Sequence, residues 1–226
     1  MSEAQKDLSD EWESEIVVVE INGVLDARTI RQAVAAKQIT LRRPESDNPL
    51  LQDRLVKIVI ITPERRIHFF SAYASQTACS DNVKNDFWAL IDEKTAVVPS
   101  EDMFIIARDL NGHVGVMKDG YRCYADFGYG VRNDNGDRIL DYAKSHNLVI
   151  VKTKFRKRPS HLVFSYDDSN KTQIDYVLVS YRDQKPVTDA KVEPYETLTS
   201  QHRPLICTMK ITPPNQKCTD RSRRPE

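Results

Sequence analysis

The dyad of Asp109 and Asn111 follows directly after the apolar run Met103–Ala107. Side chains two residues apart on an extended segment point the same way. A carboxylate there can take a proton while an amide donates a hydrogen bond to a developing oxyanion. An Asx-type turn before Gly112 explains the same residues structurally. Taken alone, the motif favours the turn, so its chemistry depends on what else the fold brings to it.

Three further polar residues stand at or inside apolar runs. Tyr73 follows the run Ile67–Ala72, where its hydroxyl could bind phosphate, although a half-buried tyrosine with a solvated hydroxyl is commoner. Asp175 interrupts the apolar run Ile174–Val179, and a buried carboxylate is costly unless paired, so a partner is implied. Asp175 could hold His202 protonated and aimed at an anion. A structural ion pair with an arginine or lysine is the alternative.

The charge balance excludes a protein that is drawn to nucleic acid as a whole. The 226 residues contain 33 Lys and Arg against 33 Asp and Glu, so any basic surface must be local. One basic run carries an aromatic residue, and we expect it to contact a nucleic-acid backbone through Lys154, Arg156, Lys157 and Arg158. A solvated turn explains this run equally well.

The alternation of apolar runs and polar turns predicts the elements that position these residues. We expect strands at residues 15–21, 55–61, 67–72, 103–107, 148–151, 174–179 and 204–211, and helices at residues 26–37, 82–95 and 136–146. The short Pro-Glu-Arg-Arg turn between the second and third strands indicates a hairpin. Strands outnumber helices, and several neighbours look antiparallel. This pattern predicts a mixed α/β (α+β) fold, a sandwich of two sheets with helices outside.

The length suits one main domain. We expect a divergent N-terminal segment at residues 1–48, the main domain at 49–211 and a disordered tail at 212–226. The acidic start lacks the features of a signal peptide, and no run of about 18 apolar residues predicts a membrane span. We therefore expect no membrane association, and a monomer.

The cysteines favour an intracellular protein. None stands in a CxxC pair or at zinc spacing, and isolated reduced thiols explain all four: Cys79, Cys123, Cys207 and Cys218. The basic stretch TDRSRR is the feature that suggests a nuclear location, although it is shorter than a typical import signal.

The order of the motifs resembles the endonuclease/exonuclease/phosphatase superfamily: a Tyr, then D-x-N, then I-D-Y, then a His-Arg pair near the C-terminus. The connecting sequence is similar to the endonuclease of RTE-type LINE retrotransposons and to craniofacial development protein 2-like proteins. The similar segments are SAYASQ, DLNGHVG, FGYGVRNDNGDRILDYAKSHNLVIVKTKF, SHLVFSY, QIDYVLVS and QHRPL.

The resemblance implies a role for each residue. Asp109 falls where the family has the base for the attacking water, and Asn111 where an amide holds the transition-state phosphate. Tyr73 falls on the phosphate-contacting tyrosine. Asp175 and His202 match the pair in which the aspartate orients a phosphate-binding histidine.

Two further implications concern support and partners. Ser165 lies near the family's Thr-Trp or Thr-Tyr pair that props the catalytic aspartate, one residue out of register. The implied cofactor is Mg²⁺ and the implied partner is DNA.

Departures from the family concern the metal site above all. The family's first strand ends in a catalytic Asn and its second in a metal-binding Glu, and residues 1–50 contain neither motif, although Glu20 lies in a strand-like run. We therefore expect the first strands to be missing or divergent, with a sheet edge exposed unless residues 15–21 cover it. No metal ligand can be assigned, and Mg²⁺ would bind weakly or not at all. Only Asp109 or Gln201 is expected to lie near a metal.

Two single residues also depart from the family. Residue 108 is Arg where the family has Gly, and a guanidinium there could pair with Asp109 and lower its basicity, or crowd the turn. Ser75 replaces the Pro that follows the Tyr motif.

Three functions remain open. The first is a Mg²⁺-dependent DNA endonuclease that nicks one strand and leaves a 3′ hydroxyl. The second is a catalytically inactive relative of that enzyme that acts as a binding protein. The third is a phosphatase of lipids or small molecules, which the connecting sequence disfavours.

Overall fold

The larger sheet carries most of the candidate residues. The computed structural model describes residues 17–21, 39–42, 54–61, 65–125, 127–162, 165–167, 170–192 and 205–210. Over these residues the larger sheet has six strands in the order β2-β3-β4-β5-β9-β6, and its neighbours are antiparallel except for β4 and β5. These strands are β2 (Ile39–Arg42), β3 (Leu55–Ile61), β4 (Arg66–Ala72), β5 (Met103–Asp109), β9 (Asp175–Ser180) and β6 (Leu148–Ile150).

A smaller sheet lies beside it. Over the same residues its order is β1-β11-β10, with β1 parallel and β10 antiparallel to β11. These strands are β1 (Val17–Ile21), β10 (Val187–Val192) and β11 (Leu205–Met209). A separate hairpin pairs β7 (Ser165–Asp167) with β8 (Asn170–Thr172).

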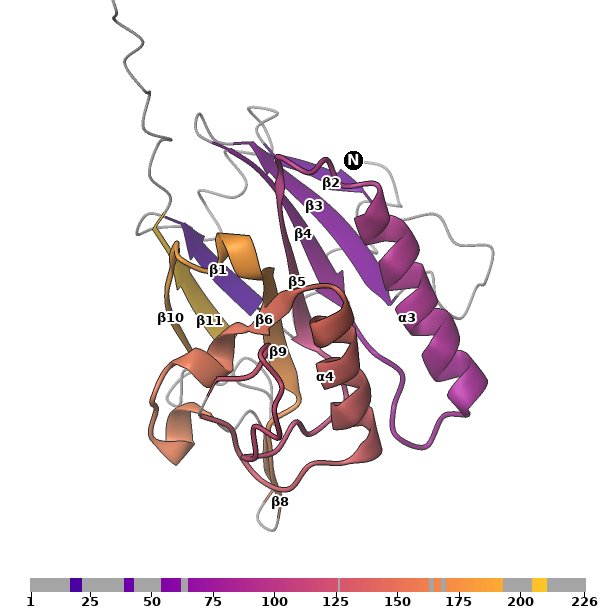
Figure 1. Cartoon of the computed structure of the whole chain (residues 1–226), viewed down its shortest axis with the longest axis vertical. Helices are drawn as coiled ribbons and strands as arrows, with labels where there is room; N and C mark the ends of the chain where they lie inside the picture. The colour runs from indigo at the N-terminus through magenta and orange to yellow at the C-terminus, as the bar shows by residue number, and fades with distance from the viewer. Residues whose placement is uncertain are drawn as a thin grey trace, which may run out of the picture.

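Two α-helices cover one face of the larger sheet, α3 (Asp81–Ala96) and α4 (Asp134–Ser145) (Figure 1). Because α3 follows β4 and α4 follows β5, both helices begin at the end of the sheet where those strands end. Three short 3-10 helices complete the described elements: η1 (Val151–Lys154), η2 (Pro159–His161) and η3 (Tyr181–Asp183). No helix in the described part of the chain is long and apolar enough to cross a bilayer.

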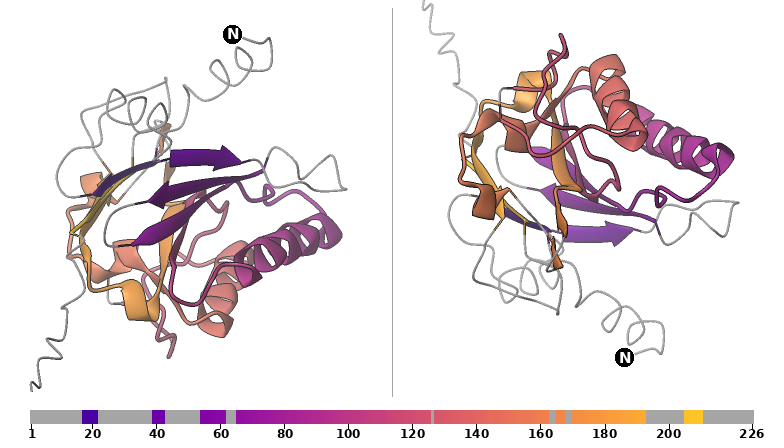
Figure 2. Two further views of the ribbon diagram at one scale, coloured as in Figure 1. Left: turned by 90° about the horizontal axis from the view of Figure 1, so that it is seen from above. Right: turned by 90° about the horizontal axis from the view of Figure 1, so that it is seen from below.

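Alternating side chains of the central strands build two apolar layers. Phe70, Ile106 and Leu178 belong to the layer under the helices. Ile105 and Val177 belong to the layer between the two sheets, where they meet residues of β10 and β11. The sheets and helices are therefore stacked as a sandwich, which Figure 2 shows from two sides. Each buried aliphatic or aromatic side chain stabilises this arrangement by about 1.5–3 kcal/mol.

The predicted α/β sandwich is confirmed, and most predicted elements form within one or two residues of their expected ends. The hairpin of β3 and β4 forms as expected. The strand expected at 148–151 ends at Ile150, because Val151 begins η1. The pattern did not predict β2, the short hairpin strands β7 and β8, or β10, whose sequence VTDAKV mixes polar and small residues. The helix expected at 26–37 lies outside the described residues.

Residues 1–48 contribute two strands, although the sequence predicts that the first strands are missing or divergent. β1 pairs with β11 in the smaller sheet, while β2 forms the outer strand of the larger sheet beside β3. Residues 17–21 therefore add to the smaller sheet, and residues 39–42 cover the β3 edge of the larger one. The domain boundaries stay predictions.

Candidate active site

Three predicted residues stand at the ends of neighbouring strands. Tyr73 follows β4, Asp109 ends β5 and Asp175 begins β9. β4 and β5 are parallel, and β9 runs antiparallel to β5 with Asp175 directly opposite Asp109. The backbone N–H of Ala74 also donates to the carbonyl of Asp109 at 2.9 Å. The pairing therefore brings these residues, far apart in sequence, to one edge of the sheet.

Both carboxylates at this edge are buried, with Asp109 4% and Asp175 2% exposed, whereas Tyr73 is half-buried. Asp175 shares its strand face with Val177, which packs between the two sheets. This end of the sheet therefore carries two buried carboxylates and a partly exposed tyrosine. A ligand could reach the tyrosine from solvent.

The loop after β5 combines both readings of the D-x-N motif. The backbone N–H of Asn111 donates to Asp109 Oδ1 at 2.8 Å, and Asn111 has a positive φ of 47°, so the Asx-type turn forms. The Asn111 amide donates to the carbonyl of Ala74 at 2.8 Å. This side chain therefore ties the loop after β5 to the loop after β4, directly beside Tyr73.

Tyr176 braces this loop from the helix side of the sheet. Its hydroxyl lies 2.9 Å from the carbonyl of Gly112 and 2.7 Å from that of Gln173, and it accepts from the N–H of Val114 at 3.2 Å. Burial raises the pKa of Tyr176 above its ordinary value, so the hydroxyl keeps its proton. Sequence reasoning treated this tyrosine as part of an apolar strand and missed its positioning role.

Helix α4 holds the same loop from the other side. Asn133 caps the helix, because its side-chain oxygen accepts from the N–H groups of Gly136 and His113, each at 2.9 Å. A Cβ on Gly136 would lie 1.8 Å from the carbonyl oxygen of His113, so only glycine allows this approach. The Asn135 amide donates to the carbonyl of Asn111 at 2.8 Å. The segment N-D-N-G therefore positions the candidate site.

Two guanidinium groups lie over the ring of Tyr73. The distance from the ring centroid is 5.7 Å to Arg54 Cζ and 5.4 Å to Arg108 Cζ, which is within range of cation–π attraction. Arg108 has a φ of 115°, a backbone conformation that favours glycine and strains other residues. The strain explains why the family has glycine here, and the structure adds that the arginine places its charge on the candidate phosphate-binding tyrosine.

Lys152 in η1 is fully buried and lies close enough to Asp175 to interact with its charge. Its ammonium donates to the carbonyl of Leu162 at 2.8 Å. Burial lowers the pKa of Lys152 from 10.5 to about 8, and attraction to Asp175 opposes that shift. Of the alternatives for the partner of Asp175, the described residues thus provide a lysine.

Of the four predicted nucleic-acid contacts, Lys154 ends η1 and the other three follow it along the chain. Arg156 and Arg158 are exposed. Lys157 is paired with Asp189 at 2.5 Å, and the Lys154 ammonium donates to a backbone carbonyl at 3.4 Å. Two of the four side chains are therefore already bound within the protein.

For the remaining predicted residues, the structure gives the backbone position at most. Ser165 lies in β7 opposite Thr172, and Gln201 and His202 lie outside the described residues. Glu20 pairs with Thr208 in the smaller sheet, so the strands that carry the buried carboxylates do not bring it to them.

The described residues do not complete a site for Mg²⁺. In the described part of the chain no three His, Cys, Asp or Glu side chains gather as metal ligands. Asp109 and Asp175 lie opposite each other in the register of β5 and β9, and Lys152 lies close enough to Asp175 to interact with its charge. Hard cations require several oxygen ligands, so these side chains do not form a dedicated metal site.

Two solved structures share the fold. The endonuclease domain of TRAS1, a telomere-specific non-LTR retrotransposon, is 14% identical, with a TM-score of 0.50 over 76% of this chain and 67% of that one. An AP endonuclease from Archaeoglobus fulgidus is also 14% identical, with a TM-score of 0.53 over 75% of this chain and 70% of that one. The chain has the endonuclease/exonuclease/phosphatase fold.

Two curated proteins are similar to this chain in sequence. Craniofacial development protein 2 from Bos taurus and from Tragulus javanicus are each 24% identical over 165 residues. The match covers 72% of this chain and 28% of each of those proteins, so the chain spans less than a third of the length of the curated relatives it matches. No protein-family model matches the chain.

Proposed function

We propose that this endonuclease/exonuclease/phosphatase-fold protein binds DNA at the candidate active site and hydrolyses a phosphodiester bond in one strand. The observation that carries the proposal is the convergence of Tyr73, Asp109, Asn111 and Asp175 at one edge of the larger sheet. The two solved structures that share the fold, an AP endonuclease and a retrotransposon endonuclease, support the same substrate class.

Each residue has a task that fits its position. Asp109 is the general base, because its buried carboxylate can take a proton from a water molecule that attacks the phosphorus. Tyr73 donates its hydroxyl to the phosphate, while Arg54 and Arg108 at its ring neutralise the phosphate charge. Asn111 fixes the spacing between the two loops.

The water oxygen forms a bond to phosphorus and gives its proton to Asp109, and the bond from phosphorus to the 3′ oxygen breaks. The leaving oxygen takes a proton from solvent, which leaves a 3′ hydroxyl and a 5′ phosphate. Mg²⁺, when bound, would supply Lewis-acid charge stabilisation. Asp175 orients His202, which binds the phosphate.

A second candidate is DNA binding without hydrolysis. It is favoured by the Arg108 guanidinium, which lies over the ring of Tyr73, and by the metal-binding Glu motif that residues 1–50 lack. Cations at this edge assist phosphate binding, but they lower the proton affinity of a neighbouring base.

A nicking assay on supercoiled plasmid separates the candidates. It uses the parent chain, Asp109→Asn, His202→Ala and Glu101→Gln, each with Mg²⁺ and with EDTA. Glu101 is the matched control because it is exposed and precedes the opposite end of β5. We expect Mg²⁺-dependent nicking by the parent and by Glu101→Gln, with a loss of roughly 100-fold or more in Asp109→Asn and His202→Ala.

Two results would overturn the endonuclease proposal. Equal nicking by all four proteins identifies a contaminating nuclease. Binding of duplex DNA by the parent without any nicking establishes the second candidate instead.

A further inference from the structure

A small pocket lies on the helix side of the candidate active site, between α3 and α4. It is lined by the loops after β4 and β5 and by both helices: Ala74, Ser75, Lys84, Phe87, Trp88, Leu110, Asn135 and Arg138. Ser75 is two residues from Tyr73, and Leu110 separates Asp109 from Asn111. The pocket and the candidate active site therefore lie back to back across the same two loops.

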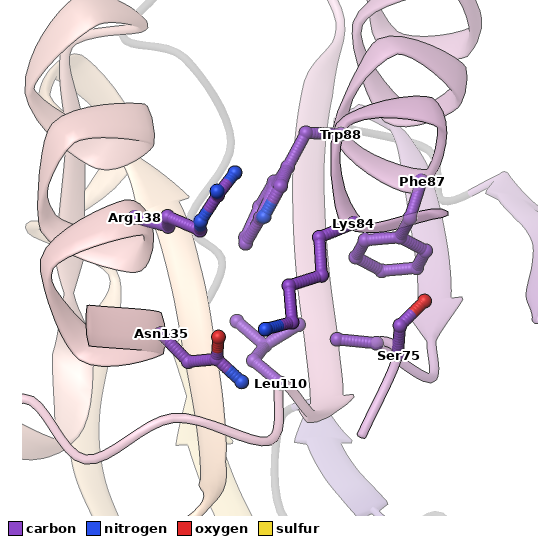
Figure 3. Close-up of a pocket in the computed structure, with 8 residues that line it drawn as sticks. Ser75, Lys84, Phe87, Trp88, Leu110, Asn135 and Arg138 are labelled. Atoms are coloured by element: carbon purple, nitrogen blue, oxygen red, sulfur yellow. The ribbon is translucent and has the colours of Figure 1, made fainter. Parts of the chain in front are cut away.

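The charged lining is entirely cationic. Lys84 reaches from α3 towards Asn135 at the start of α4, and Arg138 lies beside Trp88 (Figure 3), where its guanidinium already donates to Asp81 and Asn85 of α3. The Lys84 side chain is only 13% exposed. Its Nζ lies 3.9 Å from Oδ1 of Asp81, a side chain that is 75% exposed. A half-buried ammonium with so distant a counter-ion favours an anion in the pocket.

Two buried polar atoms in the lining lack hydrogen-bond partners. Among the described residues, neither Ser75 Oγ nor Asn135 Oδ1 has one, although the two residues are 3% and 6% exposed. An unsatisfied buried hydroxyl or amide costs about 1–3 kcal/mol. A bound anion could accept a hydrogen bond from the Ser75 hydroxyl. It would also hold the Lys84 ammonium beside Asn135, where the ammonium could donate to Asn135 Oδ1.

The size of the pocket limits what it holds. Its free volume is about 10 Å³, which is room for one water-sized group and excludes a nucleobase. One non-bridging oxygen of a phosphodiester has this size, carries negative charge and accepts hydrogen bonds. The position of the pocket, at the end of the sheet where both helices begin, adds the positive ends of two helix dipoles.

We propose that this pocket is a second phosphate subsite, in which Lys84 and Ser75 bind a backbone phosphate of the same nucleic acid that occupies the candidate active site. The inference rests on the proposed function, because it names how that substrate is held beyond its reacting phosphate. It also gives a role to Ser75, the residue that replaces proline after the Tyr motif. Hydrolysis needs one phosphate, whereas this subsite fixes the direction of the strand across the edge.

The test measures binding of a short DNA duplex in EDTA as a function of salt, for the parent, Lys84→Met, Ser75→Ala and Lys94→Met. Lys94 is the matched control, because it lies in the last turn of α3, away from the pocket, and is paired with Glu93. Thermal melting of each variant confirms that it folds. A second arm titrates inorganic phosphate and duplex separately, following the indole N–H resonance of Trp88.

We expect Lys84→Met to weaken duplex binding by roughly 3- to 10-fold at low salt, and to reduce the slope of log K against log salt by about 0.9, the share of one phosphate contact. Ser75→Ala should weaken binding by roughly 2-fold, and Lys94→Met should match the parent. The Trp88 resonance should shift with duplex in the parent but not in Lys84→Met. A shift with inorganic phosphate at lower affinity supports the same site.

The failures are distinguishable. If the parent binds and nicks DNA while Lys84→Met and Ser75→Ala bind equally well with an unchanged salt slope, the subsite is overturned and the proposed function stands. If the parent does not bind the duplex at all, both are overturned. A Trp88 resonance that shifts with inorganic phosphate but not with duplex also overturns the subsite, because the anion it takes would then not be a backbone phosphate.

Discussion

Replacing Lys152 with methionine tests the electrostatics beneath the candidate active site. Lys152 is fully buried, donates to the carbonyl of Leu162 and faces the charge of Asp175. Methionine keeps much of the length and apolar volume of the stem but removes the charge. At pH 7 the variant leaves Asp175 buried without this cation. The lowered pKa of Lys152 means that the cost of burying its ammonium exceeds the attraction to Asp175, so the variant should be at least as stable as the parent at this pH.

The dependence of stability on pH gives the size of this net penalty. Burial lowers the pKa of Lys152 from 10.5 to about 8 in the folded chain. Between these values the unfolded chain holds a proton that the folded chain has released, so raising the pH stabilises the fold. The burial penalty is therefore fully present below pH 8 and disappears by pH 10.5. At 1.36 kcal/mol per pKa unit the change is roughly 3 kcal/mol.

Urea unfolding of the parent and Lys152→Met, followed by fluorescence at intervals from pH 7 to pH 10.5 with a reductant present, measures both quantities. The difference in unfolding free energy, parent minus variant, should rise by roughly 3 kcal/mol across the upper part of that range. Other titrating groups largely cancel in this difference. A difference that stays flat or falls with pH would refute the reasoning, because Lys152 would then keep an ordinary pKa.

Other changes around the loops have expected outcomes. Arg108→Gly should relieve the strained φ and raise the free energy of unfolding by about 1 kcal/mol, while weakening duplex binding several-fold because a cation leaves the Tyr73 ring; urea unfolding and binding titrations measure the two effects. Gly136→Ala should destabilise the protein by at least about 3 kcal/mol, since its Cβ would meet the carbonyl of His113, and a thermal melt like that of the parent would contradict this. Asn111→Ala should cost about 1–2 kcal/mol and reduce any nicking, because the two site loops lose their tie.

The sequence predicts the site residues that interrupt an apolar pattern. Tyr73, Asp109 and Asp175 each stand where an apolar run ends or breaks, and strand pairing brings them together as a consequence of register. Tyr176 escapes prediction because an aromatic residue in a strand looks like ordinary core, and only the fold places its hydroxyl against the loop after β5. Lys152 follows the apolar run Leu148–Val151, so its burial depends on contacts far along the chain.

Charge at the candidate active site separates binding from hydrolysis. The cations that the structure places there, Arg54, Arg108 and Lys152, lie against the tyrosine ring and the buried carboxylate Asp175. Each of these cations favours phosphate binding, because it attracts the negatively charged phosphate directly. Hydrolysis also needs a base that takes a proton from the attacking water, and these cations do not supply one. Affinity for DNA and the rate of nicking are therefore independent readouts, and removing a cation should lower the first without lowering the second in proportion.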